Sequence, residues 1–284
     1  MADDRPQFRR ADRLSSWRRL AVHVWKTPAD PTVYGVLEVD MRRSLEYLAA
    51  LNSSPDGGAR VTATHLVVKA IAKAIAETPD SNAMIARGQV WVRDSIDIYC
   101  QVATDEGRDL SGVKIRHANR KSPAEVADEL TAAAAAVRAG RDRGSEATKQ
   151  ALGRIPDFLL RPLLRLMSFL TFDLRLDLER FGIAYDQFGS AMVSNVGGFG
   201  LHNGLAPLVP ISRSPIVLLV GQITDRPIVE HGKVIAAPVL NIGATFDHRI
   251  IDGYQGAMMA RTVIDAVKDP ERAFGPALRP SRSS

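Results

Sequence analysis

The stretch Ala244-Thr-Phe-Asp-His248-Arg-Ile-Ile-Asp252-Gly253 joins a run of strand-forming residues to an amphipathic helix. Residues 239–245 are typical of a β-strand, and the apolar spacing that follows predicts a helix over residues 252–267. His248 therefore lies where a strand ends, a position from which a side chain can point into a cleft. Histidine is the natural general base near neutral pH, although a histidine after a strand is also commonly structural. Asp252 can orient this segment through a hydrogen bond or an ion pair with an arginine.

A second stretch places the hydroxyl of Ser194 near the end of a predicted strand. It reads Val193-Ser194-Asn195-Val196-Gly197-Gly198-Phe199-Gly200. The glycines that follow let a ligand or another backbone approach closely, or they form a simple turn between strands. Their spacing matches neither the dinucleotide-binding nor the Walker pattern, and the chain has no Gly-x-Ser-x-Gly elbow. The single cysteine, Cys100, excludes an intramolecular disulfide and a multi-cysteine zinc site, and the histidines lack metal-ligand spacing. We therefore predict no metal.

The rest of the chain mixes strands and helices without strict alternation, which predicts an α+β fold. The predicted strands cover residues 33–39, 90–92, 96–103, 113–115, 191–196, 216–220, 233–236 and 239–245. The predicted helices cover residues 41–51, 62–78, 122–138 and 252–267. Breaks are expected at residues 225–227 and 230–232, where Pro227 and Gly232 lie.

Residues 139–185 form an insert whose apolar part, residues 158–176, carries several arginines and one proline. No uninterrupted apolar run approaches the roughly 20 residues that a membrane span needs. Two interpretations remain open. The first is a helical hairpin whose arginine stems lie along the surface while its leucines pack on the protein or on a second copy. The second is peripheral membrane contact by a basic amphipathic helix.

The chain has 284 residues, 45% of them hydrophobic, and a formal net charge of +5. This composition predicts a globular protein, with a basic N-terminal arm over residues 1–19 and a single domain over residues 20–284. The arm has no apolar region of the kind that secretion requires, which favours a cytoplasmic location. The excess charge is not gathered on one patterned helix, so we predict no nucleic-acid binding; basic termini can contact neighbouring subunits or attract an anionic ligand.

Read together, SNVGGFG (residues 194–200) and TFDHRIIDG (residues 245–253) resemble the catalytic domain of dihydrolipoamide acyltransferases. These are the E2 components of 2-oxo acid dehydrogenase complexes, and they share a fold with chloramphenicol acetyltransferase. HLVVKAIAKAIAETPDSNA (residues 65–83), VATDEG (residues 102–107) and IRHANRKS (residues 115–122) fall in the family's order. The resemblance covers about residues 15–138 and 186–275. It implies a chloramphenicol-acetyltransferase-like mixed sheet flanked by helices, in a trimer-forming chain.

The resemblance also implies a role for each candidate residue. His248 matches the base that removes a proton from the thiol of coenzyme A or dihydrolipoamide, so that sulfur can attack the acyl thioester. Ser194 matches the hydroxyl that hydrogen-bonds the oxyanion of the tetrahedral intermediate. Asp252 matches the acid that holds the architecture of the site. In the family this site forms between subunits of a homotrimer, and trimers often assemble into larger hollow cores.

The chain departs from the family in three ways. It has no lipoyl or peripheral-subunit-binding domain, Val113 stands where proline is expected, and the insert over residues 139–185 is longer and more hydrophobic. We therefore predict a standalone E2-like acyltransferase that uses coenzyme A or acyl-CoA as substrate and a dihydrolipoamide-like thiol as acceptor, with a lipoyl-bearing protein acting in trans. The alternatives are an acetyltransferase for a small hydroxylated molecule and a non-catalytic trimeric or cage scaffold of the same fold.

Overall fold

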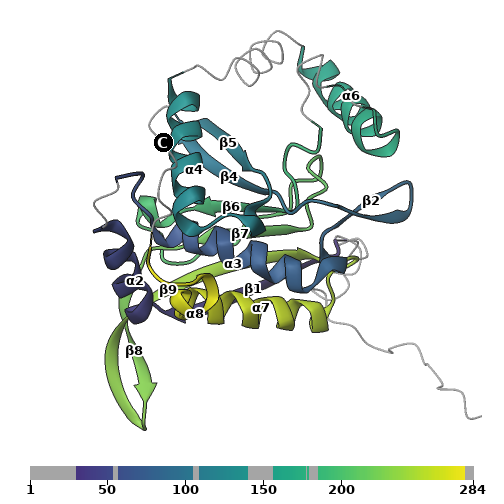
Figure 1. Cartoon of the computed structure of the whole chain (residues 1–284). Coiled ribbons are helices and arrows are strands. Elements are labelled where there is room, and N and C mark those ends of the chain that lie inside the picture. The colour runs from purple at the N-terminus through teal and green to yellow at the C-terminus, as the bar shows by residue number, and fades with distance from the viewer. Residues whose placement is uncertain are drawn as a thin grey trace, which may run out of the picture. The chain divides into compact units, whose positions relative to one another are not determined.

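The computed structural model describes residues 30–53, 57–104, 109–139, 156–176, 178 and 185–278. From Thr32 onward the chain is one unit built on a seven-stranded mixed sheet (Figure 1). The predicted arm over residues 1–19 lies outside the described residues, so its structure stays a prediction.

The sheet has the strand order β1-β9-β7-β6-β4-β5, with β8 paired to β9. Its strands are β1 (Thr32–Asp40), β4 (Ile98–Thr104), β5 (Asp109–Ile115), β6 (Ala191–Asn195), β7 (Ile216–Val220), β8 (Thr224–Glu230) and β9 (Lys233–Asp247). Strand β6 runs parallel to β4 and β7, whereas β9 runs antiparallel to β1, β7 and β8. The strand that carries Ser194 and the strand that leads to His248 therefore both flank β7.

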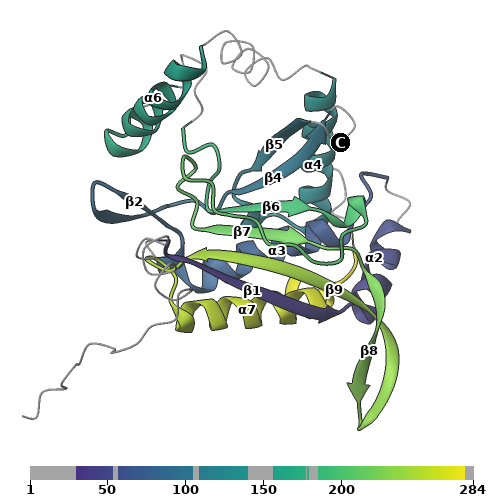
Figure 2. The ribbon, with the colours of Figure 1, turned by 180° about the vertical axis from the view of Figure 1, so that it is seen from behind.

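Helices cover one face of this sheet, as the opposite views in Figures 1 and 2 show. The helices are α2 (Arg42–Asn52), α3 (Ala63–Glu77), α4 (Pro123–Arg138), α7 (Gly253–Lys268) and α8 (Pro270–Phe274). Alternate side chains of the central strands, such as Val193, Leu218 and Ile242, share one buried cluster with residues of α3 and α7. The predicted α+β class is confirmed.

The loop after β6 crosses the opposite face of the sheet at very close range. A Cβ atom added to Gly243 in β9 would lie 1.8 Å from the carbonyl oxygen of Gly204. Only glycine at position 243 allows this approach, because any side chain would displace the crossing backbone. Residues 206, 208 and 209 of the same loop pack against Tyr99, Met192 and Val217 on that face.

Three strand predictions are wrong, each for a reason of pairing. Residues 233–247 form one continuous strand, because Pro238 lies where the partner of β9 changes from β8 to β1 and β7. The break expected at residues 225–227 lies inside β8. Among the described strands, β8 pairs with β9 alone, so it is an edge strand, and an edge strand tolerates a proline. The hairpin of β2 (Ala83–Ala86) and β3 (Gln89–Val92) was predicted only in its second strand. Its two turn residues, Arg87 and Gly88, both have positive φ angles, as a two-residue hairpin requires.

The insert contributes one described helix, α6 (Asp157–Ser168), followed by a π-helical turn (Phe169–Asp173). The apolar segment 158–176 therefore contains one helix and a π-helical turn in place of the predicted hairpin. Residues 140–155 of the insert lie outside the described part of the chain. Thr171 and Phe172 of the π-helical turn are buried, and Leu163, Leu164 and Met167 of α6 are half-buried. Phe158 and Leu166 of α6 are exposed instead.

The start of α3 is closed by a capping box that uses a histidine in place of the usual Glu or Gln. The backbone N–H of Thr62 donates to Nδ1 of His65 at 2.9 Å, and His65 is only 7% exposed. Burial lowers the pKa of His65 to about 4. Because this acceptor role needs an unprotonated Nδ1, folding favours the neutral ring.

Acid should therefore weaken the fold through His65. An unfolded histidine takes up its proton near pH 6.5, whereas the folded ring resists until about pH 4, so stability is lost as the pH falls through this window. The free energy of unfolding should drop by about 2 kcal/mol between pH 6.5 and pH 4.5, measured by urea titration. In His65→Gln, which keeps a neutral acceptor at the cap, this drop should disappear. An unchanged slope in that variant would refute the assignment.

Candidate active site

His248 lies in the turn after β9, and the backbone of that turn fixes its tautomer. Its Nδ1 atom is 3.0 Å from the carbonyl oxygen of Ile251. A carbonyl oxygen only accepts hydrogen bonds, so Nδ1 carries the hydrogen and donates. This leaves Nε2 unprotonated in the neutral ring, and the side chain is exposed. The turn thus presents a proton acceptor toward solvent, as a general base requires.

An ion pair that the sequence did not reveal holds the same turn. The guanidinium of Arg249 donates to both carboxylate oxygens of Asp247, from Nε at 2.9 Å and from Nη2 at 2.6 Å. Burial of the Asp247 carboxyl opposes its ionisation, but the hydrogen bonds from Arg249 outweigh it and keep the pKa of Asp247 below its usual value. The two residues bracket His248, so their pairing restricts the backbone that carries the imidazole.

Asp252 caps the start of α7 through hydrogen bonds, which is the first of the two roles that the sequence left open for it. Its carboxylate accepts the backbone N–H groups of Tyr254, at 2.8 Å, and Gln255, at 3.2 Å. Oε1 of Gln255 accepts the backbone N–H of Asp252 at 3.0 Å, which completes a capping box. The arginine of this turn pairs with Asp247 instead. Asp252 therefore fixes the helix start directly after Ile251, whose carbonyl orients His248.

Removing this cap should loosen the turn. Asp252→Ala is expected to lower the free energy of unfolding by about 1 kcal/mol, because two N–H groups lose their acceptor. Asp252→Asn is the matched control, since asparagine caps helices about as well as aspartate. Urea titration measures the stability difference, and acyl transfer by both variants measures how far the cap positions His248. Equal stability of the two variants would contradict the capping role.

Ser194 occupies the sheet face that is turned away from the helices. Its neighbour Val193 belongs to the core beneath the helices, and its neighbour Asn195 donates from Nδ2 to Oγ1 of Thr64 in α3 at 2.8 Å. Successive side chains of a strand point to opposite faces, so Ser194 points away from α3. Its side chain is half-buried. Asn195 also accepts the backbone N–H of Gly198 at 3.2 Å, which fixes the turn after β6.

The strand register places Ser194 and His248 at opposite ends of the sheet. Ser194 pairs with Leu219 of β7, and Leu219 pairs with Gly243 of β9. His248 follows Gly243 by five residues, a displacement of about 16 Å along the strand, and two strand spacings add about 10 Å sideways. A hydroxyl and an imidazole so far apart cannot contact one thioester. Within one copy of the chain, His248 and Asp252 therefore lie together and Ser194 lies apart from them.

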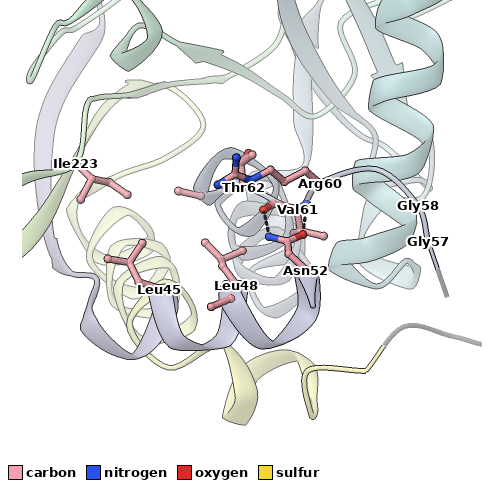
Figure 3. Close-up of a pocket in the computed structure, with 11 residues that line it drawn as sticks. Leu45, Leu48, Asn52, Gly57, Gly58, Arg60, Val61, Thr62 and Ile223 are labelled. Atoms are coloured by element: carbon pink, nitrogen blue, oxygen red, sulfur yellow. Dashed lines mark hydrogen bonds between the residues drawn. The ribbon is translucent and has the colours of Figure 1, made fainter. Parts of the chain in front are cut away.

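A pocket of about 670 Å³ opens at the Ser194 end of the sheet, beside the first turn of α3 (Figure 3). Leu45 and Leu48 of α2 form one wall and Ile223, just beyond β7, lies across from them. The side chain of Asn52 exchanges two hydrogen bonds with the backbone of Val61 and so pins the loop that forms the rim. The lining is mostly apolar with Arg60 beside it, which suits a slender chain that carries an anion.

Two negative observations apply to the described residues only. In these ranges, no group of three or more His, Cys, Asp or Glu side chains is placed to hold a metal ion. Within the same part of the chain, no helix combines the length and the apolarity that a membrane crossing requires.

A model of the 2-oxoacid dehydrogenases acyltransferase catalytic domain matches residues 18–152 and 186–275. Ser194, His248 and Asp252 fall inside this match, whereas residues 153–185 do not. Among curated proteins, the dihydrolipoyllysine-residue acetyltransferase component of the pyruvate dehydrogenase complex from Rickettsia felis is 24% identical over 229 residues. That alignment covers 80% of this chain and 45% of the relative, so the chain spans less than half of the relative's length.

Two solved structures have the same fold. A probable dihydrolipoamide acetyltransferase from Listeria monocytogenes aligns with a TM-score of 0.62 and 18% identity, over 92% of this chain and 94% of that chain. The cubic core of a pyruvate dehydrogenase multienzyme complex aligns with a TM-score of 0.61 and 19% identity, over 86% of this chain and 84% of that chain. At these identities the likeness concerns the fold alone.

Proposed function

Because the chain belongs to the family of 2-oxoacid dehydrogenase acyltransferase catalytic domains, we propose that it transfers an acyl group between coenzyme A and a thiol of the dihydrolipoamide kind. The observation that carries this proposal is the tautomer of His248, whose Nδ1 donates to the carbonyl of Ile251. The dihydrolipoamide would be presented by a lipoyl-bearing protein in trans. The apolar pocket beside α3 suits part of a substrate chain at the Ser194 end.

The proposed reaction is a direct transfer between two thiols. Nε2 of His248 takes the proton of the attacking thiol, and the sulfur forms a bond to the carbonyl carbon of the acyl thioester. The Ser194 hydroxyl donates a hydrogen bond to the oxyanion of the tetrahedral intermediate. The carbon–sulfur bond to the leaving thiolate then breaks, and this thiolate receives the proton from the imidazolium. Charges and protons balance without a covalent enzyme intermediate.

This reaction needs two copies of the chain, because one copy holds His248 and Ser194 at opposite ends of its sheet. We propose that His248 of one copy and Ser194 of the next complete each site in a cyclic homotrimer. Closed cyclic assembly supplies as many complete sites as there are subunits. The cubic core to which the fold is similar is a multienzyme assembly, and a larger assembly of trimers is part of the proposal.

Thioester exchange tests the proposal directly. The purified protein is mixed with a panel of acyl-CoAs and free dihydrolipoamide, and the appearance of acyl-dihydrolipoamide is followed. Transfer to the thiol supports the proposed function, and the preferred acyl chain identifies the substrate. Transfer to small alcohols alone would contradict the proposed function and support the alternative, an acetyltransferase for a small hydroxylated molecule. If the protein neither transfers an acyl group nor binds CoA, the hypothesis that remains is a non-catalytic scaffold of the same fold.

A further inference from the structure

Helix α6 exposes a continuous apolar face that no described part of the chain covers. Phe158 is 78% exposed, Leu166 is 52% exposed and Phe169, at the start of the π-helical turn, is 46% exposed. Leu159 and Pro162 are exposed beside them. Large contiguous apolar patches are rare on soluble monomers and mark surfaces that meet a partner or a membrane.

The sequence of α6 separates polar from apolar residues around the helix. At 3.6 residues per turn, residues 157, 161, 165 and 168 (Asp, Arg, Arg and Ser) fall on one narrow side. Phenylalanine, leucine, methionine and proline occupy the remaining positions, which take up more than half of the circumference. A helix that pairs with one other helix presents a narrower apolar stripe. A wide apolar sector bordered by arginines is typical of helices that lie in a membrane interface.

The end of α6 is fixed to the body of the protein, although the helix itself stands apart from the sheet in both ribbon views (Figures 1 and 2). Asp173 forms an ion pair with Arg213 and accepts the backbone N–H of Arg87 at 3.1 Å. Phe172 is buried beside these groups, with the guanidinium of Arg213 5.3 Å from its ring centre. Arg213 therefore compensates the charge of Asp173 at the fixed end of this segment.

We propose that α6 binds in the plane of an anionic lipid bilayer, with its apolar face among the acyl chains and its arginines at the headgroups. The helix has 12 residues. This length corresponds to about 18 Å, shorter than the roughly 30 Å of a hydrocarbon core, so the helix lies on the membrane. Helix α6 falls within residues 153–185, which the family match does not include, so this surface is an addition to the matched catalytic domain. The fixed junction at Asp173 would hold the proposed enzyme beside the membrane.

Vesicle flotation of the full-length protein tests the proposal. Phosphatidylcholine vesicles are compared with vesicles that contain 30% phosphatidylglycerol. The wild-type protein should float with the anionic vesicles, and the double variant Phe158→Ser/Leu166→Ser should lose this binding at least about ten-fold. Arg165→Gln should reduce the preference for anionic over neutral vesicles. The matched control is Val229→Ser/Val234→Ser, which removes two side chains that are 75% and 71% exposed on the β8–β9 hairpin, and it should float like wild type.

The outcomes separate the membrane from the other occupants of this face. Binding to neither vesicle, or equal binding by wild type and the α6 variant, overturns the proposal. A smaller native mass of the α6 variant in light scattering, without a change in flotation, assigns the face to a contact between copies and also overturns it. Thermal midpoints of all variants should match wild type, since the replaced side chains are exposed. Thioester exchange in detergent-free solution should not change, which keeps this test independent of the proposed function.

Discussion

Replacing His248 by alanine is expected to lower the rate of acyl transfer about 10³-fold, because the reaction loses the group that accepts the thiol proton. The side chain is exposed and its Nδ1 contact is with a single backbone carbonyl, so the melting temperature should stay within about 1 °C of wild type. Steady-state rates with acyl-CoA and dihydrolipoamide give the loss, and differential scanning calorimetry checks the fold.

The pH dependence distinguishes a base from a group that only binds substrate. Raising the pH increases the thiolate fraction of the acceptor, so the variant's residual rate should rise steeply with pH, whereas the wild-type rate should depend less on the thiolate fraction because the enzyme itself removes the thiol proton. His231→Asn is the control, since His231 lies in the β8–β9 turn with a positive φ angle that asparagine tolerates. A His248→Ala variant with the wild-type rate would remove His248 from the mechanism.

Replacing Ser194 by alanine should lower the rate about 10²-fold, through loss of one hydrogen bond to the oxyanion. The stronger test combines the two variants. When Ser194→Ala and His248→Ala chains are co-expressed in equal amounts, each site formed between two copies draws its histidine from one chain and its serine from the next. Random mixing in a ring then restores about one quarter of the wild-type sites.

This recovery depends on a site shared between copies. If His248 and Ser194 acted within one chain, the mixture would show only the average of the two damaged enzymes. Two separately tagged chains, purified through both tags, ensure that only mixed assemblies are measured, and in a mixed trimer about one site in three is complete. Failure to recover activity in such assemblies would refute the shared site, while leaving the role of His248 as base intact.

The local parts of the site could be predicted from the sequence. The strand before His248 and the helix after Asp252 follow from residue periodicity, and both are found, with β9 ending at Asp247 and α7 beginning at Gly253. For Asp252 the sequence left two roles open, a hydrogen bond that orients the segment or an ion pair with an arginine. The structure shows hydrogen bonds, in a capping box with Gln255 whose spacing is visible in the sequence.

Pairing across the sheet could not be predicted from the sequence. Pro238 reads as a break, yet β9 runs through it because its partners change at that residue. The distance between Ser194 and His248 is likewise set by β7, a strand that carries neither residue. Similarly, the leucines of α6 predict an apolar face, but whether the protein covers it depends on where the chain places the helix.

The sequence by itself therefore determined the class of fold, the helix and strand periodicities, and the side chains for which we propose a role in acyl transfer. These follow from local backbone preferences and from the chemistry of single residues. Only the tertiary structure decided that Ser194 and His248 lie at opposite ends of the sheet and that Phe158 and Leu166 of α6 are exposed. Both depend on how segments distant in the sequence are placed, whereas the Asp247–Arg249 ion pair is a local contact within the turn after β9.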